Sequence, residues 1–316
     1  MGKLTGWIVV LLLVATPASA QVAVPEIIPG APRLLSTRFD LFPQASFTPE
    51  NPAALRWGSP SRIGGGTING KSTDSSDILS SDLSGAFGGF RLVGNHIGIA
   101  IEQVSYKLEQ SLLPVEKEAS SFALAFSYPD WLAIGISAEN RTAIRTPLTG
   151  TETDEVGSAT LGLSLNISDL LFIGYALSDE SRTREILGVK TSTSRPVSMA
   201  GLGLRGGGGL IWHLEISAIT KDPFTGNPDI KEEGYDHTQA VLELAFWNMI
   251  MTIAGYDIKG TGTADNVSVE GYTADFGLAP LQGLVLTGRL ERSRLFVDNI
   301  ENIQDDAKYF TLGWQF

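Results

Sequence analysis

Residues 159–167 read Ala-Thr-Leu-Gly-Leu-Ser-Leu-Asn-Ile, and the alternation in this stretch decides the fold class. Large apolar side chains take every second position, a period of two that is typical of a β-strand. The same pattern recurs at 96–102, 121–128 and 272–278. The intervening residues are small, polar or charged, so they cannot build a soluble core but suit the polar lumen of a membrane barrel. The sequence therefore predicts an all-β protein, a transmembrane antiparallel β-barrel.

The composition excludes several classes of protein and of functional site. The 316 residues include 35 glycines, only 18% of them are charged, and the formal net charge is −12. A negative charge argues against nucleic-acid binding, which needs a basic face. The absence of cysteine excludes a disulfide scaffold, a thiolate metal site and a cysteine nucleophile. No run of 18 apolar residues follows Ala20, so we expect no transmembrane helix.

The start of the chain predicts a signal peptide over residues 1–20. Lys3 supplies a positive charge, residues 6–15 form an apolar run, and Ala18-Ser19-Ala20 fits a signal-peptidase site. We expect the mature chain to begin at Gln21, with an uncleaved N-terminal anchor as the alternative. The chain then divides into a Pro-rich segment, 21–60, and the barrel, 61–316.

Tight and loose connections alternate along 61–316. Six tight turns and seven looser loops, among them 146–156, 187–194 and 297–303, join fourteen expected strands. Long strands with short turns on one side and longer loops on the other are typical of outer-membrane barrels. The expected strands are 61–72, 79–93, 95–109, 118–129, 131–145, 156–168, 170–186, 194–206, 208–221, 235–247, 249–259, 268–280, 282–296 and 303–316.

The aromatic residues predict two interfacial girdles. Tryptophan favours the membrane–water interface, where its ring is buried and its N–H stays hydrated. One girdle lies near the tight turns and comprises Trp131, Trp212, Trp247 and Trp314. The other is expected near the loose loops and comprises Tyr106, Tyr235, Tyr256, Tyr272 and Phe296.

The C-terminal residues 308–316 read Lys-Tyr-Phe-Thr-Leu-Gly-Trp-Gln-Phe and end on Phe316. This stretch resembles the terminal β-signal of bacterial outer-membrane proteins. The resemblance implies the outer membrane of a Gram-negative bacterium, contact with outer-membrane lipids, and recognition of Phe316 by the barrel-assembly machinery.

Residues 21–60 do not alternate, and they hold seven of the fifteen prolines. Proline is excluded from central strands, so this segment precedes the barrel. It contains Asn51-Pro52-Ala53-Ala54-Leu55 just before the first strand. That motif, with fourteen strands, resembles the FadL-type outer-membrane transport proteins. In that family the N-terminal segment is a hatch that plugs the lumen.

The resemblance implies plug roles for Asn51, Pro52 and Ala53. The apolar residues of the segment, among them Phe39, Phe42 and Phe47, suit a plug seated in a lumen. A disordered periplasmic tail is the alternative interpretation of 21–60.

The alternation assigns most buried charge to the inner face of the barrel. Four members, Glu102, Glu139, Glu215 and Arg289, are expected to form a belt near mid-height. Two roles remain open, a charge network that ties the lumen to the plug, or a gate favouring cations or polar solutes. The inward set, accompanied by Arg91 and Arg205, is Glu102, Glu139, His213, Glu215, Glu243, Asp275, Arg289 and Glu291.

Catalytic, metal and cofactor sites are not expected. His96 and His213 point inward on this alternation and His237 lies near a loop, so no lipid-facing Ser–His pair forms. Asp154-Glu155 and Asp179-Glu180 are interpreted as solvated acidic loop pairs.

The family resemblance implies passive uptake of hydrophobic or amphipathic small molecules, such as long-chain fatty acids or hydrocarbons, by a monomer. Two alternatives stay open. One is a diffusion porin with an acidic, cation-favouring lumen. The other is a non-transporting scaffold or secretion partner, as in the PorV-like group of fourteen-stranded barrels.

Overall fold

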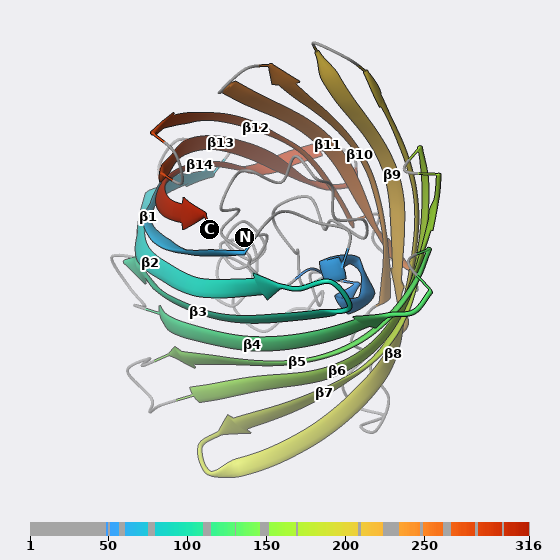
Figure 1. Ribbon diagram of the computed structural model, residues 1–316. Helices are drawn as coiled ribbons and strands as arrows, with labels where there is room; N and C mark the ends of the chain where they lie inside the picture. The colour runs from blue at the N-terminus through green and yellow to red at the C-terminus, as the bar shows by residue number, and fades with distance from the viewer. Residues whose placement is uncertain are drawn as a thin grey trace.

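The computed structural model forms a closed antiparallel barrel of fourteen strands, which confirms the predicted fold class (Figure 1). It describes residues 49, 51–56, 61–74, 80–109, 115–129, 131–145, 152–168, 170–207, 210–223, 234–246, 249–261, 267–281, 284–298 and 300–315. The expected signal peptide, most of the 21–60 segment and Phe316 lie outside these ranges.

Each strand pairs with its neighbours in chain order, and the last strand pairs with the first. A short 3-10 turn, η1 (Pro52–Arg56), precedes them. The strands are β1 (Arg62–Asp74), β2 (Ser80–Val93), β3 (Ile97–Glu109), β4 (Val115–Ser127), β5 (Leu132–Arg145), β6 (Glu152–Ile167), β7 (Leu171–Ile186), β8 (Val189–Gly207), β9 (Ile211–Lys221), β10 (Gly234–Phe246), β11 (Met249–Thr261), β12 (Val267–Leu281), β13 (Leu284–Val297) and β14 (Ile300–Gln315).

Closure is made by β1 and β14, in register from Arg62–Gln315 to Asp74–Ile303. Along every strand the alternation separates an outer from an inner face. In β6, for example, Leu161 and Leu163 are exposed while Gly162 and Ser164 are buried inside. Within the described ranges, no helix is long and apolar enough to cross a bilayer.

The tryptophan girdle agrees with the outer face, whereas part of the tyrosine girdle does not. Trp131, Trp212 and Trp314 are exposed near the short connections, and Trp247 lies outside the described residues. Tyr272 is exposed as expected. Tyr235 and Tyr256, which were also expected in that girdle, are instead buried inside the barrel. They share the strand parity of inward residues such as Val241 and Ala254.

Two connections that were expected to be loose are tight. β7 and β8 are joined by Leu187 and Gly188 alone, with φ of 52° and 80°. Two successive residues with positive φ match the right-handed twist of a two-residue hairpin. β13 and β14 are also joined by two residues, of which Asp298 has a φ of 51°. β6 begins at Glu152, inside the expected 146–156 loop.

Leu187 is an unfavourable residue for a left-handed conformation, and replacing it tests the hairpin geometry. Because asparagine tolerates positive φ, we expect Leu187→Asn to raise the free energy of unfolding by about 1 kcal/mol. Guanidinium unfolding of the protein in lipid vesicles measures the change. Gly188→Ala should lower stability in the same assay, and a destabilising Leu187→Asn would contradict the assigned turn.

Candidate functional site

The segment η1 lies inside the ring of strands, against the inner face of β3–β7 (Figure 1, blue). Asn51, Ala53, Ala54 and Leu55 are all fully buried there. The Asn-Pro-Ala motif is therefore in the barrel interior.

Asn51 both shapes this turn and attaches it to the wall. Its side-chain Oδ1 accepts a hydrogen bond from the Ala53 N–H at 3.1 Å, as an N-cap residue does, and Pro52 follows at the first helical position. The Nδ2 group donates to the carbonyl oxygen of Leu163 at 2.9 Å and, more weakly, to that of Tyr175 at 3.4 Å. One amide thus joins η1 to β6 and β7.

The segment η1 fits closely against the wall because the residues at the points of contact are glycines, which have no side chain. A Cβ on Gly162 would lie 2.0 Å from Asn51 Oδ1, and one on Gly135 would lie 2.4 Å from the Ala53 nitrogen. Both distances are far below van der Waals contact. Only glycine therefore fits under the docked turn at these two positions.

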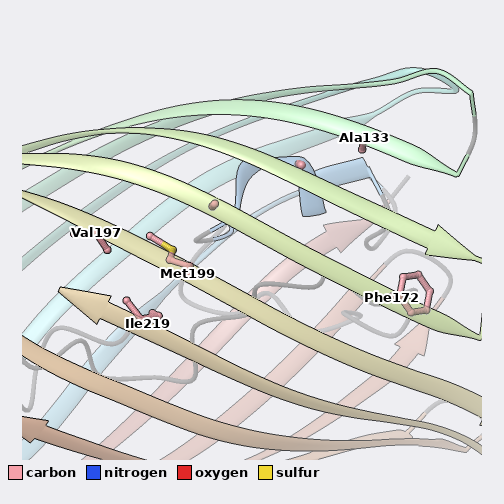
Figure 2. Close-up of a cluster of buried hydrophobic side chains, with 7 residues drawn as sticks. Ala133, Phe172, Val197, Met199 and Ile219 are labelled. Carbon is pink, nitrogen blue, oxygen red and sulfur yellow. The ribbon is translucent and has the colours of Figure 1, made fainter. Parts of the chain in front are cut away.

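Small apolar residues surround this contact. Leu55 packs with Ala100, Ala123 and Ala125 of β3 and β4. Ala53 belongs to a second cluster that follows the wall from β5 to β9, most of which is seen in Figure 2: Ala133, Phe172, Ala176, Val197, Met199 and Ile219. The part of the lumen wall in contact with η1 is therefore apolar.

Arg56 ties the end of η1 to the short-connection end of the barrel. Its guanidinium donates to Ser127 Oγ at 2.7 Å and to the carbonyl oxygens of Gly94 and Asn95 at 2.6 and 2.5 Å. β3 pairs in register with β2 from Gly98 to Glu109 and with β4 from Ile97 to Leu108.

Gly162→Ala tests whether the wall holds η1. Because the new methyl group would overlap Asn51, we expect the turn to leave its seat while the barrel stays folded. Tryptic cleavage after Arg56, followed by mass spectrometry, should become about tenfold faster as the docked segment opens more often. Gly288→Ala is the control, since its Cβ would meet no atom closer than the Tyr309 carbonyl oxygen at 4.0 Å. Equal cleavage rates in the two variants would contradict the steric argument.

Of the predicted plug residues, Asn51, Pro52 and Ala53 occupy the seat described above. Phe39, Phe42 and Phe47 lie outside the described residues. The plug role of the whole 21–60 segment stays a prediction.

The structure places the predicted lumen residues on the inner face of the barrel. Glu139 has 22% of its side chain exposed, and the others are buried: Glu102, His213, Glu215, Glu243, Asp275, Arg289 and Glu291. The expected belt is distributed over separate groups, in which Glu139 contacts Arg141 and Arg289 contacts Asp275. The role of these residues in transport stays a prediction.

Six inward residues form one cross-strand row, which we call the polar row. Register pairs link each member to the next across β8–β13, and the row reads Arg205, His213, Glu243, Thr252, Asp275 and Arg289. Within it, Arg289 binds both carboxylate oxygens of Asp275, and His213 Nδ1 lies 3.4 Å from Glu243 Oε2. Next to the row, Glu291 accepts a hydrogen bond from the Tyr309 hydroxyl at 2.9 Å.

A second buried charge cluster centres on Glu180, which the sequence interpretation had placed in an acidic loop pair. Glu180 lies within β7 and accepts from Arg195 Nε at 2.8 Å and from Lys221 Nζ at 2.5 Å. Arg141 Nη2 is 3.7 Å away, and the Tyr235 ring lies 5.5 Å from both Arg195 and Lys221. The same alternation that buries Ala176 and Ser178 continues to Glu180. The period of two along β7 could therefore have placed Glu180 on the inner face.

Asp154 was placed in the other acidic loop pair, and it is likewise buried. It lies in β6, where it accepts a hydrogen bond from Arg182 Nε at 2.8 Å.

His96 was expected to point inward but lies exposed in the β2–β3 turn. His237 was expected near a loop but is buried on the inner face of β10. Among the described residues, no group of three or more His, Asp or Glu has an arrangement that holds a metal ion.

Neutralising Glu180 leaves three cations around a site that no longer carries a negative charge. We expect Glu180→Gln to lower the free energy of unfolding by about 3 kcal/mol, because a buried charge without its counter-ion is strongly destabilising. Adding Lys221→Met should recover part of the loss, as guanidinium unfolding would measure. The exposed pair Lys190–Glu185 is the control, and Lys190→Gln should cost less than about 1 kcal/mol. A Glu180→Gln protein as stable as the original would contradict the electrostatic account.

No protein-family model matches the chain, and no curated protein matches it by sequence. Solved structures do match it. The CymD monoaromatic hydrocarbon channel is 8% identical with a TM-score of 0.57, and the match covers 84% of this chain and 91% of that one. The Ralstonia pickettii toluene transporter TbuX is 10% identical with a TM-score of 0.54, covering 84% and 92%.

A Pseudomonas aeruginosa FadL homologue is 10% identical with a TM-score of 0.53, and the match covers 89% of this chain and 96% of that one. Identities this low establish similarity of fold. The chain therefore has the fold of the FadL-type channels, and the resemblance read from the Asn-Pro-Ala motif and the strand count is confirmed at that level.

Proposed function

We propose that this protein is a channel in the outer membrane of a Gram-negative bacterium for the passive uptake of hydrophobic or amphipathic small molecules. The single observation that carries the proposal is the segment Asn51–Arg56, docked inside a closed barrel on a wall built of glycine and alanine. A segment seated in this way closes part of the lumen and must move for a solute to pass.

The physical properties of the barrel support this function. Its outer face is a band of exposed Leu, Ile and Phe with tryptophans near the short connections, which suits lipid. Its inner wall beside η1 is apolar, which suits a hydrocarbon body. Neighbours of the same fold are described as monoaromatic hydrocarbon channels and toluene transporters. Hydrocarbons and long-chain fatty acids are the candidate substrates, and the hatch is opened by a solute that binds the open state better.

Assembly and surroundings follow from the same proposal. The barrel-assembly machinery recognises the terminal Phe316, outer-membrane lipids surround the barrel, and the protein works as a monomer without a cofactor. A diffusion porin is the second candidate, favoured by the polar row and by the seven buried carboxylates among the described residues of the inner face.

Locking η1 to the wall tests the function. An ideal Cβ on Gly98 lies 2.9 Å from Leu55 Cγ, close to the spacing of a Cβ and the distal sulfur in a disulfide. We expect the oxidised Leu55→Cys/Gly98→Cys protein to lose toluene uptake in porin-deficient Gram-negative cells, and a reductant to restore it. The two single variants are controls, and the chain has no other cysteine. Uptake that is equal in the oxidised and reduced forms would contradict the hatch, and ion conductance unaffected by the lock would favour the porin.

A further inference from the structure

We propose that the polar row binds the hydroxyl or amino group of an aromatic substrate, with His213 as the residue that recognises it. This inference rests on the proposed function, because it names the class of substrate for the same lumen. The substrate is a small aromatic molecule with one hydrogen-bond donor.

His213 is a buried side chain with no hydrogen-bond partner among the described residues. It is 1% exposed, and neither ring nitrogen has a hydrogen bond within the described part of the chain. Buried polar atoms are almost always satisfied, and an imidazole in this state has two nitrogens available to a bound molecule. A neutral imidazole offers one donor and one acceptor, and a hydroxyl group complements both.

The neighbours of His213 in the polar row add polar contacts. Glu243 lies opposite it in register, with Oε2 3.4 Å from Nδ1. Thr252 lies opposite Glu243, and its buried hydroxyl also lacks a hydrogen-bond partner among the described residues. Acceptors from a carboxylate and a threonine on adjacent strands suit a donor group on the substrate. They disfavour a substrate carboxylate, which Glu243 and the nearby Glu215 would repel.

An apolar surface begins on the other side of His213. The Phe172 ring meets the imidazole edge to face, with centroids 6.3 Å apart. Phe172 belongs to the apolar cluster that includes Ala53 of η1 and lines the wall shown in Figure 2. Once η1 has moved, as the proposed function requires, a substrate ring can lie on this surface while its donor group reaches His213. The combination favours an aromatic alcohol or amine over both a plain hydrocarbon and a fatty-acid carboxylate.

The test measures initial uptake of toluene, 4-methylphenol and 4-methylbenzoate by porin-deficient Gram-negative cells that express the full chain. The three compounds share a ring and a methyl group and differ in the group that would meet His213. We expect 4-methylphenol to enter faster than 4-methylbenzoate. His213→Phe keeps a ring against Phe172 but removes both nitrogens, and should slow 4-methylphenol about tenfold while leaving toluene within about twofold, the loss expected for one buried hydrogen bond.

His237→Phe is the matched control. His237 is as buried as His213 and also lacks hydrogen bonds among the described residues, but its ring contact is with Tyr256. We expect it to leave the ratio of the uptake rates unchanged. Heat-modifiable migration in gels verifies that both variants fold.

The outcomes separate the two claims. Toluene uptake with no 4-methylphenol uptake, a preference for 4-methylbenzoate, or an equal loss of toluene and 4-methylphenol in His213→Phe would overturn the inference and leave the proposed function standing. Failure of the original chain to carry any of the three compounds would overturn both.

Discussion

The pairing of β1 with β14 is the constraint on which the rest of this structure depends. A lipid bilayer offers no hydrogen bonds to the edge of a sheet, so a membrane sheet must close on itself. The register from Arg62–Gln315 to Asp74–Ile303 satisfies both edges. Once the sheet is closed, the parity of each strand decides which side chains meet lipid and which enter the lumen. The apolar outer band and the charged, glycine-rich interior both follow from this one condition.

Closure also creates a lumen whose two sides differ. Where η1 packs on β3–β7, the inner face is made of small residues, and Asn51 and Arg56 bind η1 to the wall. On β8–β13 the inner face carries the polar row with its charged side chains. Buried charges are tolerated in the lumen because they are paired, as Arg289 is with Asp275 and Glu180 of β7 is with Lys221. The interior therefore offers an apolar region beside η1 and a polar row on β8–β13, which is the arrangement that an amphipathic solute requires.

Period-two alternation predicted most of the inner face, including residues far apart in the chain, such as Glu102 and Glu291. The sequence interpretation was wrong where a residue was placed by its distance from a loop or by its neighbours, and not by its parity along the strand. Tyr235 was placed on the outer girdle because it lies near a loop, although its parity matches that of the inward Glu243. Glu180 was placed in a loop because acidic pairs usually are, although the alternation of β7 continues through it. Leu187–Gly188 is not one of the Asn-Gly or Asp-Gly pairs that are typical of two-residue turns. The composition therefore indicated a loop there, and the β7–β8 hairpin is longer than expected.

The sequence by itself determined the fold class, the fourteen strands, and the face of the sheet on which most side chains lie, because alternation is a local property that each strand carries alone. Tertiary structure decided which residues meet. Asn51 reaches the Leu163 carbonyl across 112 positions of the chain, and its seat exists because Gly135 and Gly162 come to the same place on neighbouring strands. Such contacts depend on strand register and on closure of the whole barrel, and no local pattern in the chain encodes either of them.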